Sequence, residues 1–175
     1  MGLSHDDPIF KLRHMKYVNI CLIVLLSFNL NSNNSFYLVL EMIKQRESFQ
    51  PEVYICPSGI KTQGYGMTNK LTKKPKTKEQ AEKDLIEIME SYYNFTCNRY
   101  PHLTDAQCWA VVSIGLNCKF ESIYGSKSCF HKALKNKKVP PFERFVYYKT
   151  KQGWKKSSNL VRSRLFEKTL FKNGK

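Results

Sequence analysis

Apolar residues in this 175-residue chain follow a helical period in most places, with one short exception near the start. Residues 36–46 carry a single apolar stripe and predict a helix that ends at about Glu47. Residues 48–67 are instead rich in glycine, proline, β-branched and aromatic residues, which predicts two strands at residues 53–55 and 60–62 joined by a turn. The residues of the helical stripe are Tyr37, Leu38, Leu40, Met42 and Ile43.

The rest of the chain is predicted to be helical. Thr77 and Thr104 each precede a glutamine by three residues, Gln80 and Gln107, which is the capping-box pattern of a helix start. Gly153 indicates a turn between the last two helices. The remaining predicted helices run from Ser126 or Ser128 to Leu134, over residues 142–149 and over residues 159–171. A small sheet followed by a separate helical lobe belongs to the α+β class.

The most apolar stretch, residues 18–30, follows three basic residues and precedes a polar run at residues 31–35. This order is typical of a secretory signal peptide, although a buried helix would have a similar composition. Translation can begin at the first residue or at Met15. We therefore assign residues 1–35 to a signal peptide, or to an uncleaved signal anchor that tethers the protein to a membrane, with an upstream extension. Residues 36–175 form one globular domain.

The chain carries 29 lysines and arginines against 14 acidic residues, a formal net charge of +15. Residues 36–175 keep 26 basic and 12 acidic residues, and residues 131–175 alone hold 14 basic and two acidic ones. Such a charge indicates an anionic partner, which composition alone does not identify. No nucleic-acid recognition motif and no metal-ligand spacing such as CxxC occurs, so we expect no nucleic-acid partner, no metal and no cofactor.

Three residues with chemically useful side chains follow the spacing Glu-x8-Cys-x5-Thr: Glu47, Cys56 and Thr62. Their predicted places are a helix end, a strand turn and a strand end, so a hairpin facing the helix end can bring them to one cleft. This spacing resembles the active-site pattern Glu-x8-(Asp or Cys)-x5-Thr of phage-type lysozymes, glycoside hydrolase family 24. Cys56 in place of the commoner aspartate is the main departure.

Four ordered blocks carry the resemblance over residues 38 to 171. Residues 42–49 (MIKQRESF) are similar to the family's helix before its catalytic glutamate, and residues 53–66 (VYICPSGIKTQGYG) to its hairpin. Residues 107–117 (QCWAVVSIGLN) and residues 160–167 (LVRSRLFE) are similar to its core helix and to a late helix. The resemblance implies a lysozyme-like fold, with a small β-hairpin lobe, a larger helical lobe and the active site between them.

The resemblance also implies an activity, cleavage of the β-1,4 bond between N-acetylmuramic acid and N-acetylglucosamine in peptidoglycan with inversion. Glu47 would be the general acid, and Cys56 and Thr62 would position the attacking water. Residues that match the far wall of the family's cleft are substrate-contact candidates. These are Leu116, Asn117 and Ser128. We expect an exported monomer, in the periplasm or outside the cell, whose partner is bacterial peptidoglycan.

Removal of Cys21 with the signal would leave five cysteines, an odd number. One hypothesis keeps Cys56 reduced and pairs the other four, with a connectivity that the sequence does not specify. Another treats several of them as buried thiols. In a third, Cys56 is trapped in a disulfide until a thiol such as Cys21 exchanges with it.

Two other functions compete with the hydrolase. The first is a catalytically impaired protein of the same fold that binds the cell wall through its basic surface. The second is a peptidase in which Cys56 acts with His102 or His131, although neither histidine lies in a motif.

Overall fold

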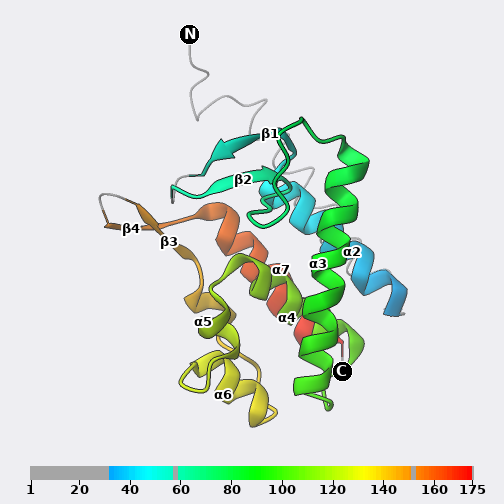
Figure 1. Ribbon diagram of the computed structural model, residues 1–175. Coiled ribbons are helices and arrows are strands. Elements are labelled where there is room, and N and C mark those ends of the chain that lie inside the picture. Colours follow the sequence, from blue (N-terminus) through cyan, green and yellow to red (C-terminus); the bar gives the residue numbers. More distant parts are fainter. Residues whose placement is uncertain (1–31, 57–58, 151–152, 175) are drawn as a thin grey trace, which may run out of the picture. The chain divides into compact units, whose positions relative to one another are not determined.

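Residues 32–56, 59–150 and 153–174 are described by the computed structural model of the protein, in which helices predominate (Figure 1). Residues 1–31, with the predicted signal stretch and Cys21, lie outside the described residues. The helices are α2 (Ser32–Glu47), α3 (Lys78–Arg99), α4 (Asp105–Asn117), α5 (Phe120–Tyr124), α6 (Cys129–Lys135), the 3₁₀ helix η1 (Phe142–Arg144) and α7 (Ser158–Asn173). The strands are β1 (Gln50–Ile55), β2 (Lys61–Gly64), β3 (Tyr147–Thr150) and β4 (Gly153–Lys156).

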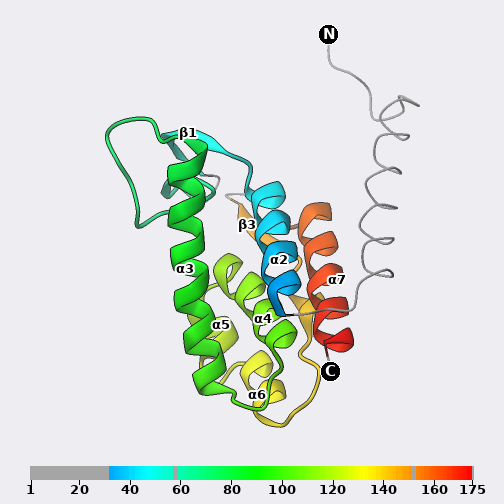
Figure 2. The ribbon, with the colours of Figure 1, turned by 90° about the vertical axis from the view of Figure 1, so that its right-hand side faces the viewer.

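Helix α4 forms the centre of the helical lobe (Figure 2). Residues 106–115 are all buried, and a helix that is apolar on every side needs neighbours on every side. Helices α2, α3, α5 and α7 provide them. Both predicted capping boxes are present, at Thr77 before α3 and at Thr104 before α4.

Strands β1 and β2 form an antiparallel hairpin, in which Tyr54 lies opposite Thr62. The pairing is irregular between Gln50 and Tyr54. Strand β2 packs against α3, where a Cβ added at Gly64 would lie 3.0 Å from the Cβ of Ala81. The predicted hairpin is confirmed, and it lies beside the end of the helix that it follows.

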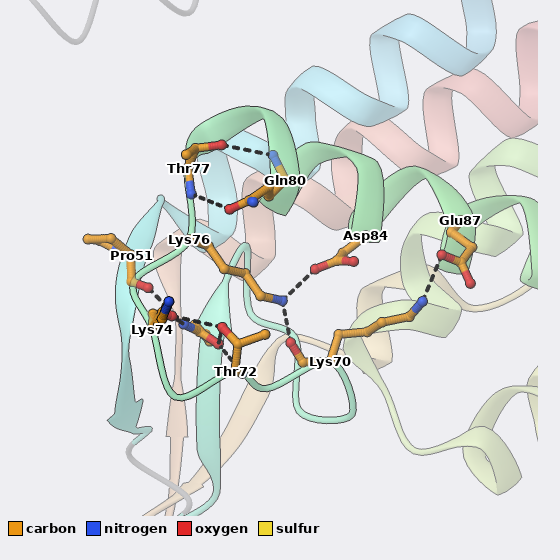
Figure 3. A network of polar contacts seen from close by, with 10 residues as sticks. Pro51, Lys70, Thr72, Lys74, Lys76, Thr77, Gln80, Asp84 and Glu87 are labelled. Atoms are coloured by element: carbon orange, nitrogen blue, oxygen red, sulfur yellow. Dashed lines mark hydrogen bonds and ion pairs between the residues drawn. The ribbon is translucent and has the colours of Figure 1, made fainter.

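Residues 68–77 connect this hairpin to α3 through a network of polar contacts (Figure 3). The fully buried amide of Gln63 donates to the carbonyl oxygens of Pro51, at 2.9 Å, and Lys74, at 3.1 Å, and accepts from the backbone N–H of Thr72, at 2.8 Å. The buried ammonium group of Lys76 contacts Asp84 and the carbonyl oxygen of Lys70. These contacts fix the connection to both β1 and α3 although it has no helix or strand of its own.

A second antiparallel hairpin, β3–β4, replaces the helix predicted over residues 142–149. Only Phe142–Arg144 is helical, as one 3₁₀ turn. The apolar spacing of Phe142, Phe145 and Val146 imitates a helix, but Val146 begins a run of β-branched and aromatic residues that favours a strand. Gly153, with φ of +114°, follows the turn of this hairpin. The prediction of a helix here is wrong because local spacing alone does not separate the two structures.

The stripe predicted for α2 is shifted in the structure. Tyr37 is 62% exposed, whereas Ser35, Val39 and Ile43 are buried in successive turns of the face that packs on α4. Phe36 adds a ring contact with Trp109 of α4, with centroids 5.1 Å apart. Helix α5 was not predicted, because five residues are too few to show a period.

Candidate active site

Glu47 is the last residue of α2, and its side chain is 27% exposed. Its Oε1 accepts a hydrogen bond from Nε of Arg46 at 2.8 Å. Its Oε2 lies beside the backbone of Gly66, because a Cβ added there would lie 2.9 Å from that oxygen. Gly66 also has φ of +78°, so this position requires glycine for two reasons. One oxygen of Glu47 is thus held by an arginine and the other lies against the segment after β2.

Arg46 connects Glu47 to a buried cluster of charges between α2, α4 and α7. Its Nη1 lies 3.7 Å from Oε1 of Glu167, and both side chains are buried. Glu167 also accepts from Oγ of Ser113 at 2.6 Å and pairs with Nη1 of Arg164 at 2.9 Å. Burial raises the pKa of Glu167, while Arg164, Arg46 and Ser113 act in the opposite direction. The two guanidinium groups and the hydroxyl therefore offset part of the cost of burying this carboxyl group.

The same cluster reaches one of the substrate-contact candidates. Nη2 of Arg164 donates to Oδ1 of Asn117 at 2.9 Å. Asn117 is the exposed last residue of α4, and this contact fixes the orientation of its amide. A continuous chain of polar contacts thus leads from Glu47 to Asn117.

Tyr54 lies among the three residues of the predicted catalytic pattern. Burial raises the pKa of its hydroxyl, and the charges of Glu47 and Cys56 raise it further, whereas a hydrogen bond with Thr62 lowers it. Thr62 is 4% exposed and its Oγ1 donates to the carbonyl oxygen of Ile60 at 2.9 Å. Cys56 is half-buried at the end of β1. Tyr54 therefore lies opposite Thr62 in the hairpin and within electrostatic range of Glu47 and Cys56.

The other two substrate-contact candidates differ in their surroundings. Leu116 is half-buried near the end of α4. Ser128 is the N-cap of α6, where its Oγ accepts from the backbone N–H groups of Phe130 and His131. Its hydroxyl also donates to the carbonyl oxygen of Ser122 at 2.5 Å. Ser128 thus has a clear structural role in starting α6, whatever it does for substrate.

Both histidines considered as partners of Cys56 form their contacts in the helical lobe. The Nδ1 of His131 lies 2.5 Å from the hydroxyl of Tyr100, and the Nε2 of His102 lies 3.0 Å from the carbonyl oxygen of Leu134. These contacts give no support to a Cys–His peptidase. Among the residues that the structure describes, His, Cys, Asp and Glu side chains form no group suited to a metal ion.

A hollow with a volume of about 650 Å³ lies elsewhere on the described surface. It is lined by residues 70–76 together with Gln80 and Asp84, and by none of the predicted site residues. Its only buried lysine, Lys76, already contacts Asp84. The candidate site, which consists of Glu47 and the β1–β2 hairpin, is therefore separate from this hollow.

Sequence reasoning did not single out Tyr54, Gly66, Arg46 or Glu167 as residues of this site. Tyr54 lies on the predicted strand two positions before Cys56, which follows the strand, and this proximity along the chain was an available signal. The positive φ of Gly66 and the pairing of Arg46 with Glu167 depend on how α2, α7 and the hairpin pack. No local pattern contains that information.

An α+β fold with a carboxylate at a helix end facing a small hairpin is the arrangement of a lysozyme-like protein, and solved structures show the same fold. The muramidase domain of SpmX from Asticaccaulis excentricus has a TM-score of 0.62 and 23% identity, over 77% of this chain and 94% of that chain. The endolysin of the Escherichia coli O157:H7 phage FAHEc1 has a TM-score of 0.62 and 21% identity, over 82% and 94%. The active form of the P1 phage endolysin Lyz has a TM-score of 0.61 and 23% identity, over 90% and 94%.

The family model described as phage lysozyme matches residues 44–167, which span the whole site from Lys44 to Glu167. The chain belongs to the phage lysozyme family. It is accordingly a glycoside hydrolase of the lysozyme type, a class that degrades peptidoglycan. A comparison with curated proteins found no match. No helix within the described residues has both the length and the apolar character that crossing a membrane requires.

Proposed function

We propose that the protein is a muramidase that hydrolyses the β-1,4 bond between N-acetylmuramic acid and N-acetylglucosamine with inversion at the anomeric carbon. The observation that carries the proposal is the position of Glu47, which shares its surroundings with Tyr54, Thr62 and Cys56. Glycoside hydrolysis needs an acid on one side of the bond and a group that positions water on the other. A carboxylate at a helix end and polar groups on a facing hairpin satisfy this requirement.

Glu47 gives its proton to the glycosidic oxygen as the bond to the anomeric carbon breaks. Arg46 holds Oε1, so the carboxyl group keeps one orientation and Oε2 stays on the side of the hairpin. A catalytic group that is already held in its reactive orientation lowers the barrier, because no further entropy is lost in orienting it during the reaction. Arg46 acts through Glu47 and is a positioning residue.

Cys56 and Thr62 position the water that attacks the anomeric carbon from the opposite face. The thiolate of Cys56 accepts a proton from this water, as an aspartate would, and the hydroxyl of Thr62 orients it. The water oxygen forms the new bond to carbon, and the leaving sugar keeps the proton from Glu47. A single displacement inverts the configuration, and no sugar is attached to the protein.

We further propose that the protein is exported and acts as a monomer on the cell wall, possessing either a cleaved signal or a tether through residues 18–30. The basic residues after His131 support adsorption to the anionic wall. The family, whose members include endolysins, favours action outside the cytoplasm. Fractionation of cells that produce the full chain tests this: recovery of the whole protein in the cytoplasm would contradict it.

The decisive experiment measures release of reducing ends from purified peptidoglycan by the wild type and by Glu47→Gln. We expect Glu47→Gln to lose at least about 10²-fold in rate because it has no proton to give. Glu52→Gln is the matched control, since Glu52 is an exposed carboxylate on the neighbouring strand, and it should keep full activity. Full activity of folded Glu47→Gln would refute the proposal.

Product chemistry tests the bond and the stereochemistry. Borohydride reduction of the new ends should give the alcohol of muramic acid, whereas the alcohol of glucosamine would mean that the other bond is cut. Proton NMR of the first product should show the α-anomer if the reaction inverts. A wild-type protein that binds peptidoglycan and releases no sugar would instead support the impaired wall-binding protein, for which the replacement of aspartate by Cys56 is the specific argument.

A further inference from the structure

Two cysteines of the helical lobe lie within contact distance of each other. Sγ of Cys97, near the end of α3, is 2.7 Å from Sγ of Cys108, in the second turn of α4. A disulfide bond joins two sulfurs at about 2.04 Å, so a small side-chain movement separates this contact from a covalent bond. Neither cysteine belongs to the candidate active site.

Neighbouring contacts between α3 and α4 keep the two cysteines facing each other. The hydroxyl of Tyr93, one turn before Cys97, donates to Oδ1 of Asp105 at 2.6 Å. The ring of Tyr93 also stacks on Trp109, with centroids 4.3 Å apart and planes 24° apart. Asp105 and Trp109 lie on either side of Cys108 in α4. The two helices are thus held in register by a hydrogen bond and a ring stack around the thiol pair.

We propose that Cys97 and Cys108 form a disulfide bond that staples α3 to α4 when the protein meets a disulfide oxidant. The oxidant is a small-molecule or protein disulfide, such as oxidised glutathione. The thiolate of one cysteine attacks this disulfide and releases one thiol, and the second cysteine then attacks the mixed disulfide and releases the other. Two protein thiols are oxidised, one disulfide is reduced to two thiols, and the two protons pass to the released sulfurs.

Accessibility determines the order of these steps. Cys97 is half-buried and Cys108 is fully buried, so the oxidant reaches Cys97 first. Burial raises the pKa of Cys108, and its hydrogen bond with Cys97 and the charge of Asp105 raise it further. The attack by Cys108 is therefore the slower step, and the mixed disulfide on Cys97 is the intermediate to trap.

The proposed pairing specifies the connectivity of two cysteines, which the sequence left open. With Cys97 and Cys108 joined, Cys118 and Cys129 are the remaining thiols of the helical lobe. Burial raises the pKa of Cys118 to about 11, which makes it a poor partner in thiol exchange, whereas Cys129 is exposed. The proposal does not depend on the hydrolytic function, and neither of its tests uses activity.

The first test maps the bond by mass spectrometry. Trypsin places Cys97 on the peptide of residues 84–99, but leaves Cys108 and Cys118 together on residues 100–119. The full-chain Cys118→Ser variant is therefore equilibrated with reduced and oxidised glutathione, alkylated and digested without reduction. We expect residues 84–99 linked to residues 100–119. Unlinked peptides, or a link from Cys97 to Cys129, would overturn the proposal.

The second test is thermal unfolding with and without reductant. A disulfide across the short connection between α3 and α4 restricts the unfolded chain. It should raise the unfolding midpoint of the oxidised protein by about 5–10 °C. Cys129→Ser should keep this shift, and Cys97→Ser and Cys108→Ala should each lose it. Each variant is compared with itself, oxidised against reduced, so a change in its basal stability does not affect the measured shift. A shift that survives in Cys97→Ser would assign the bond to other cysteines and refute ours.

Discussion

The guanidinium group of Arg46 lies 3.7 Å from the carboxylate of Glu167, and neither side chain is accessible to more than a trace of solvent. The two residues are 121 positions apart in a chain whose first and last described helices, α2 and α7, are packed together. The contact matters because the same guanidinium holds Glu47. It links the orientation of the proposed acid to the core of the helical lobe.

Replacing Arg46 with methionine keeps most of the side-chain volume and removes both contacts. Glu167 retains Arg164 and Ser113, so we expect a loss of about 1–3 kcal/mol in the free energy of unfolding, less than for a carboxylate left with no partner. Hydrolysis should fall at least about 10-fold because Glu47 loses its positioning contact. Urea unfolding and reducing-end release measure the two effects. Arg144→Met, at an exposed arginine, is the control, and unchanged hydrolysis in Arg46→Met would contradict the positioning role.

Gly66→Ala tests how closely the hairpin approaches Glu47. The new methyl group would lie 2.9 Å from Oε2 of Glu47, and the positive φ adds a strain of about 1–2 kcal/mol. Gly59→Ala carries similar strain, with φ of +81°, but its methyl group meets no atom within 4 Å. We expect comparable losses of stability in the two variants and a loss of hydrolysis in Gly66→Ala alone. Equal activities would place the reacting groups away from Gly66.

Tyr54→Phe removes the hydroxyl that hydrogen-bonds with Thr62 and lies within electrostatic range of Glu47 and Cys56. The ring remains in place, so the free energy of unfolding should change by about 1 kcal/mol or less. Activity should fall by up to about 10-fold, because the hydrogen bond to Thr62 is lost beside the proposed water site. Tyr148→Phe, at an exposed tyrosine of β3, should match the wild type in both measurements. Wild-type kinetics in Tyr54→Phe would show that the hydroxyl has no part in catalysis.

Variants of Cys56 test its role as the group that accepts a proton from water. Cys56→Asp should keep or raise the rate of hydrolysis, since a carboxylate can accept the proton of the attacking water in place of the thiolate. Cys56→Ala should lower it by about 10²-fold. A thiol peptidase would be inactivated by both changes, so the activity of Cys56→Asp separates the two mechanisms. The measurement is the initial rate on purified peptidoglycan in the presence of reductant.

His131 should make stability depend on pH near neutrality. Burial lowers its pKa below 6.5, and the positive charges of Arg99 and Lys135 lower it further. The unfolded chain therefore binds a proton at a higher pH than the folded protein, and stability falls as the pH drops from about 6.5 through the pKa of the folded state. The difference in urea midpoint between the wild type and His131→Gln should shrink over this range. A difference that stays constant with pH would contradict the assignment, and His102→Gln serves as the reference variant.

Much of the fold was predictable because its signals are local. The capping boxes at Thr77 and Thr104 and the positions of both helices that follow come from spacings of three and four residues, and the structure confirms them. The same kind of reasoning failed at residues 142–149, where an aromatic run also satisfies a helical spacing and the chain forms β3. The same reasoning also predicted the wrong buried face for α2, because Tyr37 is exposed and Val39 is buried.

The sequence by itself determined the family, the α+β class and the spacing of Glu47, Cys56 and Thr62, because those patterns consist of residue types at fixed short spacings. Only the tertiary structure decided which residues surround them. The pairing of Arg46 with Glu167, the approach of Gly66 to Glu47 and the contact between Cys97 and Cys108 each join residues of different elements that no local spacing pairs. Such contacts depend on how helices and hairpins pack. The identity of a charged residue does not show whether it will be buried or exposed in the folded protein.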